Sequence, residues 1–128
     1  MILCDTNIFI EFYKNTPDIL QELHYMGYQH IALSAITQGE LYVGARNKAE
    51  FHKIKRHLAL LHHFPLTKTI TQKFLDLMET YCLSHALSLP DSLIAATALV
   101  HDVELYTLNT KDFQYIDNLR LYQPVTHL

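Results

Sequence analysis

The sequence predicts a three-layer α/β/α sandwich with a mainly parallel central sheet. Short apolar runs of strand character alternate with longer runs of helical period, which is the pattern of an α/β fold. The first run, residues 1–4, is apolar at every position, as expected for a strand that is covered on both faces. A chain of 128 residues is long enough for one domain with a real core, and it contains no repeat, linker or low-complexity tract. We therefore expect a single domain over residues 1–128.

Residues that start and stop helices place the elements of the first half. Thr16 can cap a helix whose first position is Pro17, and Gly27 can end that helix. Ser34 follows a short apolar run and can cap the next helix. From these signals the first half is expected to hold, in order, a strand at 1–4, helices at 8–13 and 17–27, a strand at 30–33, and helices at 35–45 and 49–63.

The second half contains the most apolar helix of the chain. Thr69 and Gln72 match a capping box at the start of a long helix, and Pro90 suits the first turn of the apolar helix. The expected order is a strand or connector at 64–66, the long helix, the apolar helix at 89–101, a strand at 103–108, a polar turn at 109–112, a last strand at 119–122 and a loose tail at 123–128. The helix at 49–63 and the long helix should each bury one stripe, respectively Phe51, Ile54, Leu58 and Leu61, and Phe74, Leu75, Met78 and Cys82.

Composition excludes several classes of protein. With 49% hydrophobic and 18% charged residues, the chain is typical of a globular protein, and its apolar runs are too short to span a membrane. No basic segment precedes the apolar start, so we expect no signal peptide and a cytoplasmic protein. A net charge of −3 argues against a wide basic face for nucleic acid. Cys4 and Cys82 lack metal-site spacing and are expected to be buried thiols.

Four carboxylates are expected to share one edge of the sheet. Asp5 directly follows the first strand, and Asp112 follows the strand at 103–108. Asp91 opens the helix that leads into that later strand, and Glu40 lies on an apolar stripe of the helix after the second strand. In an open parallel sheet, ligands bind outside the carboxyl ends of the strands. A glutamate on an apolar stripe also needs a partner.

A cluster of carboxylates favours a divalent cation. Two carboxylates about 4 Å apart repel by roughly 4 kcal/mol at an effective dielectric constant near 20, whereas a helix cap contributes only about 1 kcal/mol. Oxygen ligands favour Mg²⁺ or Mn²⁺ over zinc, and the remaining coordination positions can take phosphate oxygens and an attacking water. Without metal, at least one carboxyl pKa should be raised, because like charges resist ionising together.

Four short segments carry a resemblance to a known family. In chain order they are Leu3-Cys4-Asp5-Thr6-Asn7, Thr37-Gln38-Gly39-Glu40-Leu41, Asp91-Ser92-Leu93-Ile94-Ala95-Ala96 and Thr107-Leu108-Asn109-Thr110-Lys111-Asp112-Phe113. On these segments, which span nearly the whole chain, the protein resembles the PIN-domain family, and more narrowly the small bacterial ribonuclease toxins of the VapC type. Pro90 and Cys4 depart from the alanine and the aliphatic residue that the family often has.

The resemblance implies a Mg²⁺- or Mn²⁺-dependent endoribonuclease, the toxin of a toxin–antitoxin pair, that leaves a 5′-phosphate and a 3′-hydroxyl. It implies that the protein forms a homodimer, is neutralised by a small antitoxin and has no membrane association. The metal ligands and catalytic residues that it implies are Asp5, Glu40, Asp91 and Asp112, and the groups that would orient carboxylates or water are Thr6, Asn7 and Asn109.

The same residues also have purely structural interpretations. Asp5 and Asp91 can be helix caps, Asp112 can close an Asx turn, and Asn109 can be a turn residue. His101-Asp102 is interpreted as a helix end. The basic cluster on the helix at 49–63 is most often a solvated face, although it could guide RNA or an antitoxin; it comprises His52, Lys53, Lys55, Arg56 and His57.

Two other classes of function remain open from the sequence. One is a Mg²⁺-binding, phospho-accepting signalling domain, which needs an acidic pair after the first strand and an aspartate at the end of a central strand. Asp5 stands alone, and we expect no central strand to end in aspartate. The other is a catalytically silent PIN fold that serves only as a binding module, and the presence of all four acids counts against it.

Overall fold

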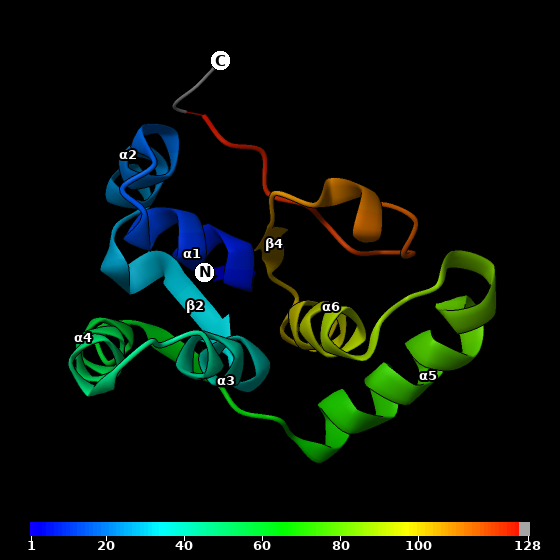
Figure 1. Ribbon diagram of the computed structural model, residues 1–128. Helices are drawn as coiled ribbons and strands as arrows, with labels where there is room; N and C mark the ends of the chain where they lie inside the picture. Colours follow the sequence, from blue (N-terminus) through cyan, green and yellow to red (C-terminus); the bar gives the residue numbers. More distant parts are fainter. Residues whose placement is uncertain (126–128) are drawn as a thin grey trace.

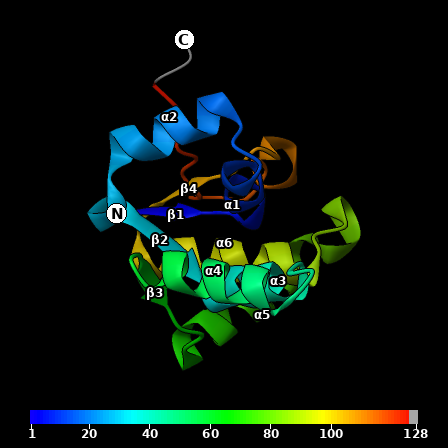
Figure 2. The ribbon, with the colours of Figure 1, turned by 60° about the vertical axis from the view of Figure 1, so that its left-hand side comes forward.

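The computed structural model describes residues 1–125 and contains a sheet of four parallel strands. The strand order is β3-β2-β1-β4, with β1 (Ile2–Cys4), β2 (Ile31–Ser34), β3 (His62–Phe64) and β4 (Glu104–Tyr106). Helices cover both faces, so the predicted three-layer α/β/α sandwich is confirmed; Figure 2 shows the sheet with α2 on one side and α5 and α6 on the other. The α-helices are α1 (Thr6–Tyr13), α2 (Pro17–Met26), α3 (Ala35–Val43), α4 (Lys48–Leu58), α5 (Lys68–His85) and α6 (Leu89–His101), with short 3₁₀ helices η1 (Tyr28–His30) and η2 (Thr110–Asp112).

The inner strands β1 and β2 bury successive positions because each face of the sheet packs on its own core, whereas the edge strand β3 exposes His62 and His63. Leu3, Ala32 and Leu105 lie in the core that α5 and α6 cover. Their chain neighbours Cys4 and Tyr106 lie in the other core, beneath α1, α2 and α4. Successive side chains of a strand point to opposite faces, so a sheet covered on both faces needs no polar position.

The crossovers place the end of β1 at a switch point. From β1 the chain moves to β2 and then β3 on one side, and it returns to the other side of β1 only with β4. The Asp5 N–H donates to the Tyr106 carbonyl at 2.9 Å, which ties the end of β1 to the end of β4. Ligand sites of parallel sheets lie at such points, so the fold places Asp5 where a site is expected.

The helix α4 ends five residues earlier than the apolar pattern predicts. It stops at Leu58, and β3 then pairs with β2, so the prediction of a helix through residue 63 is wrong. Leu58 and Leu61 are both buried, and their spacing of three residues is typical of one face of a helix, but a turn lies between them. His57 also does not face solvent; it is half-buried and its ring stacks on Phe12 at 4.9 Å. Of the predicted basic cluster, His52, Lys53, Lys55 and Arg56 are exposed.

Thr67, and not Thr69, caps α5. Its hydroxyl accepts the Ile70 N–H at 3.2 Å, so the predicted capping box is wrong: an earlier hydroxyl satisfies a free N–H at the helix start. Leu75 is 52% exposed and Cys82 is also exposed, while Ile70 and Leu77 are buried. The expectation of two buried thiols therefore holds only for Cys4.

The other helix signals hold with smaller changes. Ser34 caps α3 as predicted, by accepting the Thr37 N–H at 3.2 Å. Thr16 precedes α2, but its side chain makes no capping hydrogen bond, so that predicted cap is wrong; its hydroxyl instead donates to the Glu11 carboxylate at 3.2 Å. His101 ends α6 as predicted and stacks on Phe64 at 3.9 Å.

The segment after η2 is less regular than predicted. The expected strand at 119–122 is reduced to a single bridge between Leu105 and Leu121. Val125 then donates its N–H at 2.6 Å to the carboxylate of Glu22, which is fully buried on α2. The predicted tail therefore lies against the fold up to residue 125, and its remainder, 126–128, lies outside the described residues. Within residues 1–125, no helix has the length and apolar character needed to cross a bilayer.

Candidate active site

Asp5 is a buried carboxylate held by two donors. It is 6% exposed and stands directly between β1 and α1. One carboxylate oxygen accepts the Thr6 N–H at 2.7 Å, so Asp5 does cap α1, as its structural interpretation states. The other oxygen accepts the Thr107 hydroxyl at 2.8 Å, from a residue that follows β4. A cap alone does not require the second bond or the burial.

Glu40 is joined to α1 through Thr6. The Thr6 hydroxyl donates to Glu40 Oε1 at 2.7 Å, and the hydroxyl oxygens of Thr6 and Thr37 lie 3.1 Å apart. Thr6 thus contacts two of the predicted acids, Asp5 through its backbone and Glu40 through its side chain. Glu40 itself is exposed. The partner that we expected for its carboxylate is the Thr6 hydroxyl, at the edge of the sheet. Gly39 faces open space, with nothing within 4 Å of an added Cβ.

Asp91 lies in the first turn of α6 but does not cap it. The cap is Ser88, whose hydroxyl accepts the Asp91 N–H at 3.3 Å, so the capping interpretation of Asp91 is wrong. A carboxylate in the first turn is stabilised by the positive end of the helix dipole, and this one is half-buried. Asp112 is exposed at the end of η2.

The four acids share one electrostatic environment. Burial is the largest cause that raises the pKa of Asp91 to about 6, and the charges of Asp5, Asp112 and Glu40 raise it further. The pKa of Asp5 is raised first by burial and then by Glu40 and Asp112, against the hydrogen bonds from Thr107 and Thr6. The expectation of a raised carboxyl pKa is confirmed, with burial as its main cause. In Figure 1 the starts of α1 and α6, the helix α3 and the segment after β4 surround the centre of the view.

Thr107 is a site residue that sequence reasoning missed. Its hydroxyl donates to Asp5 and accepts the Asn109 N–H at 3.1 Å, so it links the turn after β4 to the carboxylate after β1. Asp5 and Thr107 are 102 residues apart in the chain. The available signal was a threonine at the end of a buried strand, within a segment already noted for its resemblance.

Asn7 and Asn109 tie the loops of the site together. The side-chain oxygen of Asn7 accepts the Leu108 N–H at 3.4 Å. The backbone N–H of Asn109 donates to the Thr107 hydroxyl. Of the three residues expected to orient carboxylates or water, Thr6 contacts two acids directly. Asn7 and Asn109 instead hold the segment that carries Thr107.

The donor set fits a hard divalent cation. Carboxylate oxygens are the ligands that Mg²⁺ and Mn²⁺ prefer, and the two raised pKa values indicate carboxylates that a cation would stabilise. Among residues 1–125, no three His, Cys, Asp or Glu side chains already stand together as a complete metal site. The match between this site and a divalent cation therefore rests on two features: the oxygen ligands of the four acids, and the negative electrostatic field of their carboxylates.

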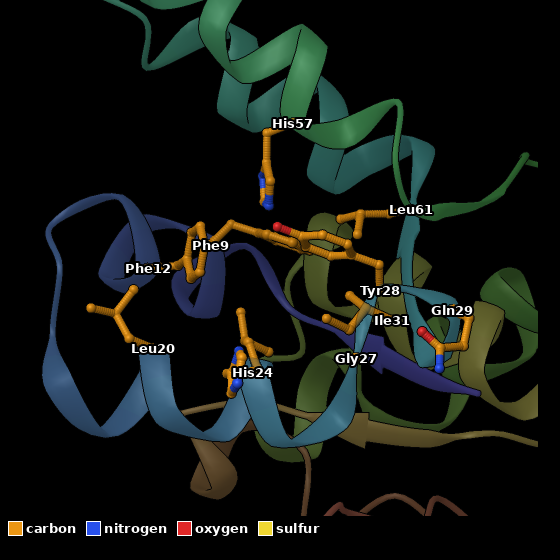
Figure 3. Close-up of a pocket in the computed structure, with 11 residues that line it drawn as sticks. Phe9, Phe12, Leu20, His24, Gly27, Tyr28, Gln29, Ile31, His57 and Leu61 are labelled. Atoms are coloured by element: carbon orange, nitrogen blue, oxygen red, sulfur yellow. The ribbon is translucent and has the colours of Figure 1, made fainter.

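An apolar pocket of about 560 Å³ lies apart from the acids, between α1, α2 and α4. None of the four acids lines it. Figure 3 shows His57 entering from α4 opposite Leu20 and His24 of α2, with aromatic rings between them. His57 Nδ1 lies 2.9 Å from the Tyr13 hydroxyl, and burial lowers the pKa of His57. The pocket was not predicted, because its walls come from three separate segments of the chain.

Comparison with known proteins agrees with this geometry. A family model described as PIN domain matches residues 2–119. The chain belongs to the PIN domain family. Ribonuclease VapC10 of Mycobacterium tuberculosis is 37% identical to it over 91 residues, 70% of this chain and 68% of that protein. Ribonuclease VapC1 of Rickettsia felis is 29% identical over 128 residues, 94% of this chain and 93% of that protein.

Solved structures place the whole chain in the same PIN domain fold. A toxin–antitoxin complex from Klebsiella pneumoniae contains a chain that superposes on this one with a TM-score of 0.81 and is 31% identical to it. The superposition covers 98% of this chain and 100% of that chain. The predicted family and fold are thus confirmed. As expected, no strand within the described residues ends in aspartate, although the inner strand β1 ends at Cys4 directly before Asp5. Membership of the PIN domain family now argues against that class.

Proposed function

We propose that this protein is a Mg²⁺- or Mn²⁺-dependent endoribonuclease that hydrolyses RNA phosphodiester bonds. The observation that carries the proposal is the link of Asp5 and Glu40 through Thr6, together with the charges of Asp5, Asp112 and Glu40 that raise the pKa of Asp91. The relatives named as ribonucleases support RNA as the substrate. Their similarity covers 70% and 94% of this chain, respectively.

The chain's own groups are arranged to keep Asp5 ionised and in place. Two hydrogen bonds to its oxygens, from the Thr6 N–H and the Thr107 hydroxyl, favour the charged form and oppose the effect of burial. Thr6 also holds the Glu40 carboxylate by a 2.7 Å bond, so one residue sets the spacing between two acids. Asp91, with a pKa of about 6, is mostly ionised at neutral pH in the metal-free protein and takes up a proton as the pH falls through about 6.

The four acids are the residues that would hold the metal. When bound, a divalent cation would lower the pKa of a coordinated water and neutralise charge that develops on the phosphate. Mg²⁺ usually takes only one or two protein carboxylates, so Asp5 and Asp91 are the first candidates as ligands. Glu40 would position the attacking water, and Asp112 would complete a second metal position or tune the first.

Cleavage of a mixed cellular RNA pool by purified protein tests this function. We expect cutting with Mg²⁺ or Mn²⁺, none with chelator, and at least a hundredfold loss in Asp5→Asn and Asp91→Asn. Asp76→Asn, an exposed aspartate on α5, is the matched control and should cut like the wild type. Cutting that survives chelation, or that both site variants retain, contradicts the proposal. A folded, partner-free protein that cuts nothing supports the silent binding module.

We further propose that the protein is the toxin of a toxin–antitoxin pair and forms a homodimer. The similar structure from Klebsiella pneumoniae is a toxin–antitoxin complex, and the apolar pocket offers a surface for a partner's apolar side chains. Leu20→Asp, in the pocket wall, should abolish co-purification with the antitoxin and leave RNA cleavage intact. Leu66→Asp, an exposed site outside the pocket, is the control. Light scattering on the purified chain tests the dimer.

A further inference from the structure

Three aromatic rings form a stack between the end of α5 and the segment after η2. The His85 ring lies parallel to that of Tyr115, with centroids 4.1 Å apart and an angle of 11°. Tyr81, one turn earlier on α5, meets both rings edge-on, at 5.6 Å from His85 and 5.1 Å from Tyr115. Figure 1 shows the C-terminal end of α5 beside the orange segment that carries Tyr115. Two parts of the chain that are distant in sequence therefore build one aromatic surface.

This aromatic stack borders the acidic edge. Tyr115 lies three residues after Asp112. His85 lies three residues before Ser88, and the Ser88 hydroxyl accepts the Asp91 N–H. Burial and then the charges of Asp91 and Asp112 raise the pKa of Tyr115, so its hydroxyl lies in the field of both carboxylates. The stack thus lies next to the place where a scissile phosphate would bind.

Packing explains the inner rings but not the outer one. Tyr81 and Tyr115 are half-buried against the core, and the Tyr81 hydroxyl accepts the Asp117 N–H at 3.1 Å, so both have structural roles. His85 is exposed in the last turn of α5, just before Ala86 ends the helix in the left-handed region at φ 54°. Its Nδ1 lies 2.7 Å from the Ser84 hydroxyl, which orients the ring. An exposed, oriented ring on top of a stack contributes little to the core.

We propose that His85 and Tyr115 form a platform on which a nucleobase of single-stranded RNA stacks beside the cleavage site. This inference rests on the proposed ribonuclease function and adds a residue pair that positions the substrate. Proteins that bind single-stranded RNA commonly hold unstacked bases on aromatic or histidine rings. An edge with four carboxylates repels phosphates, so contact with an uncharged base supplies binding that does not depend on neutralising that charge.

The test measures kcat and KM on a short single-stranded RNA that the wild-type protein cuts with Mg²⁺. Loss of one stacked base corresponds to about a 5- to 150-fold loss in affinity, and we expect a rise of about tenfold in KM for His85→Ala with kcat changed less than threefold. His85→Phe should keep KM close to wild type, because it retains the flat ring. His30→Ala is the control, since exposed His30 lies at the opposite end of the strands, just before β2.

A second measurement locates the base that stacks. An abasic nucleotide is placed in turn at each position of the same RNA. At one position beside the cut, it should raise the wild-type KM as much as His85→Ala does and should raise that of His85→Ala little further. Tyr115→Leu should behave like His85→Ala, and circular dichroism checks that each variant is folded.

The outcomes separate the two proposals. If the wild type cuts RNA but His85→Ala leaves KM unchanged, the platform is refuted and the ribonuclease proposal stands. If His85→Ala weakens binding of a protein partner and not KM, the stack belongs to a protein interface and the platform is also refuted. If the wild type cuts no RNA under any metal condition, both proposals fail.

Discussion

Replacing Asp91 by asparagine should stabilise the metal-free protein while removing its activity. Asp91 is half-buried in the first turn of α6, and burial together with the charges of Asp5, Asp112 and Glu40 raises its pKa to about 6. An amide of the same shape carries no charge, so the variant removes the cost of ionising this group near three other acids. In the metal-free protein the Asp91 carboxylate therefore lowers stability, and its proposed role is to bind the metal.

The size of the effect follows from the pKa shift. A rise from 3.8 to about 6 corresponds at face value to about 3 kcal/mol at neutral pH. Because Asp91 is only half-buried, solvent screening reduces this figure, and we expect a gain of about 1 kcal/mol. For a domain of this length, that gain raises the melting temperature by about 4 °C.

The gain should depend on pH in a definite direction. Below the ordinary pKa of 3.8, Asp91 is protonated in both the folded and the unfolded chain, and the variant gains nothing. As the pH rises, the unfolded chain ionises first, and the folded wild type loses stability until the pH passes about 6. The stability difference between variant and wild type should therefore grow from pH 4 to pH 6 and stay constant above about pH 6.5.

Urea unfolding of both proteins in chelator, at half-unit steps from pH 4 to pH 7.5, measures this difference. Asp76→Asn on α5 is the control and should give no pH-dependent gain. Adding Mg²⁺ should then stabilise the wild type more than Asp91→Asn, because a ligand stabilises the state that binds it. A pH-independent difference, or a variant less stable than wild type at pH 7, would refute the electrostatic reasoning.

Three further substitutions test single contacts. Thr107→Val removes the hydroxyl that donates to Asp5, so it should raise the Asp5 pKa further, lower the free energy of unfolding by about 1–2 kcal/mol and reduce RNA cleavage. Thr107→Ser keeps the hydroxyl and should leave the pKa, the stability and the cleavage unchanged. Carboxyl NMR titration and urea unfolding measure the first two effects. Glu22→Leu removes the acceptor of the Val125 N–H, so hydrogen exchange at Val125 should become faster, and Glu22→Gln, which keeps an acceptor oxygen, should change it less. Gly39→Ala fills open space on α3 and should stabilise the protein by up to about 1 kcal/mol in thermal unfolding; a loss of stability would mean that a close contact exists there.

Much of the fold is determined by local sequence pattern. The fully apolar run at 1–4, the run His30–Leu33 and the capping residue Ser34 place β1, β2 and α3 with errors of one or two residues. These features are readable because a strand's burial and a helix's cap depend on residues close in the chain. Asp5, Glu40 and Asp91 could be selected as site candidates for the same reason, since each stands at or near the end of a predictable element.

Tertiary structure decides which of these local signals are used. Leu58 and Leu61 keep a helical spacing, yet α4 ends between them because β3 pairs with β2, and strand pairing is a long-range contact that no local period encodes. Thr67, and not Thr69, caps α5, because the Thr67 hydroxyl accepts the N–H of Ile70 in the first turn. In both cases the local sequence allows two alternatives, either two end points for α4 or two capping threonines for α5, and the folded structure uses one of them.

The candidate site itself is a product of the crossovers. Sequence alone identified the acids, but only the return of the chain to β4, beside β1, brings Thr107 within hydrogen-bonding distance of Asp5. The same geometry sets His85 against Tyr115 and closes the apolar pocket around His57. A hydrogen bond or ring contact needs ångström-scale placement of atoms from distant segments, and that placement depends on strand order and helix packing. The sequence by itself therefore determined the elements and the kinds of chemistry, and the tertiary structure decided which side chains meet.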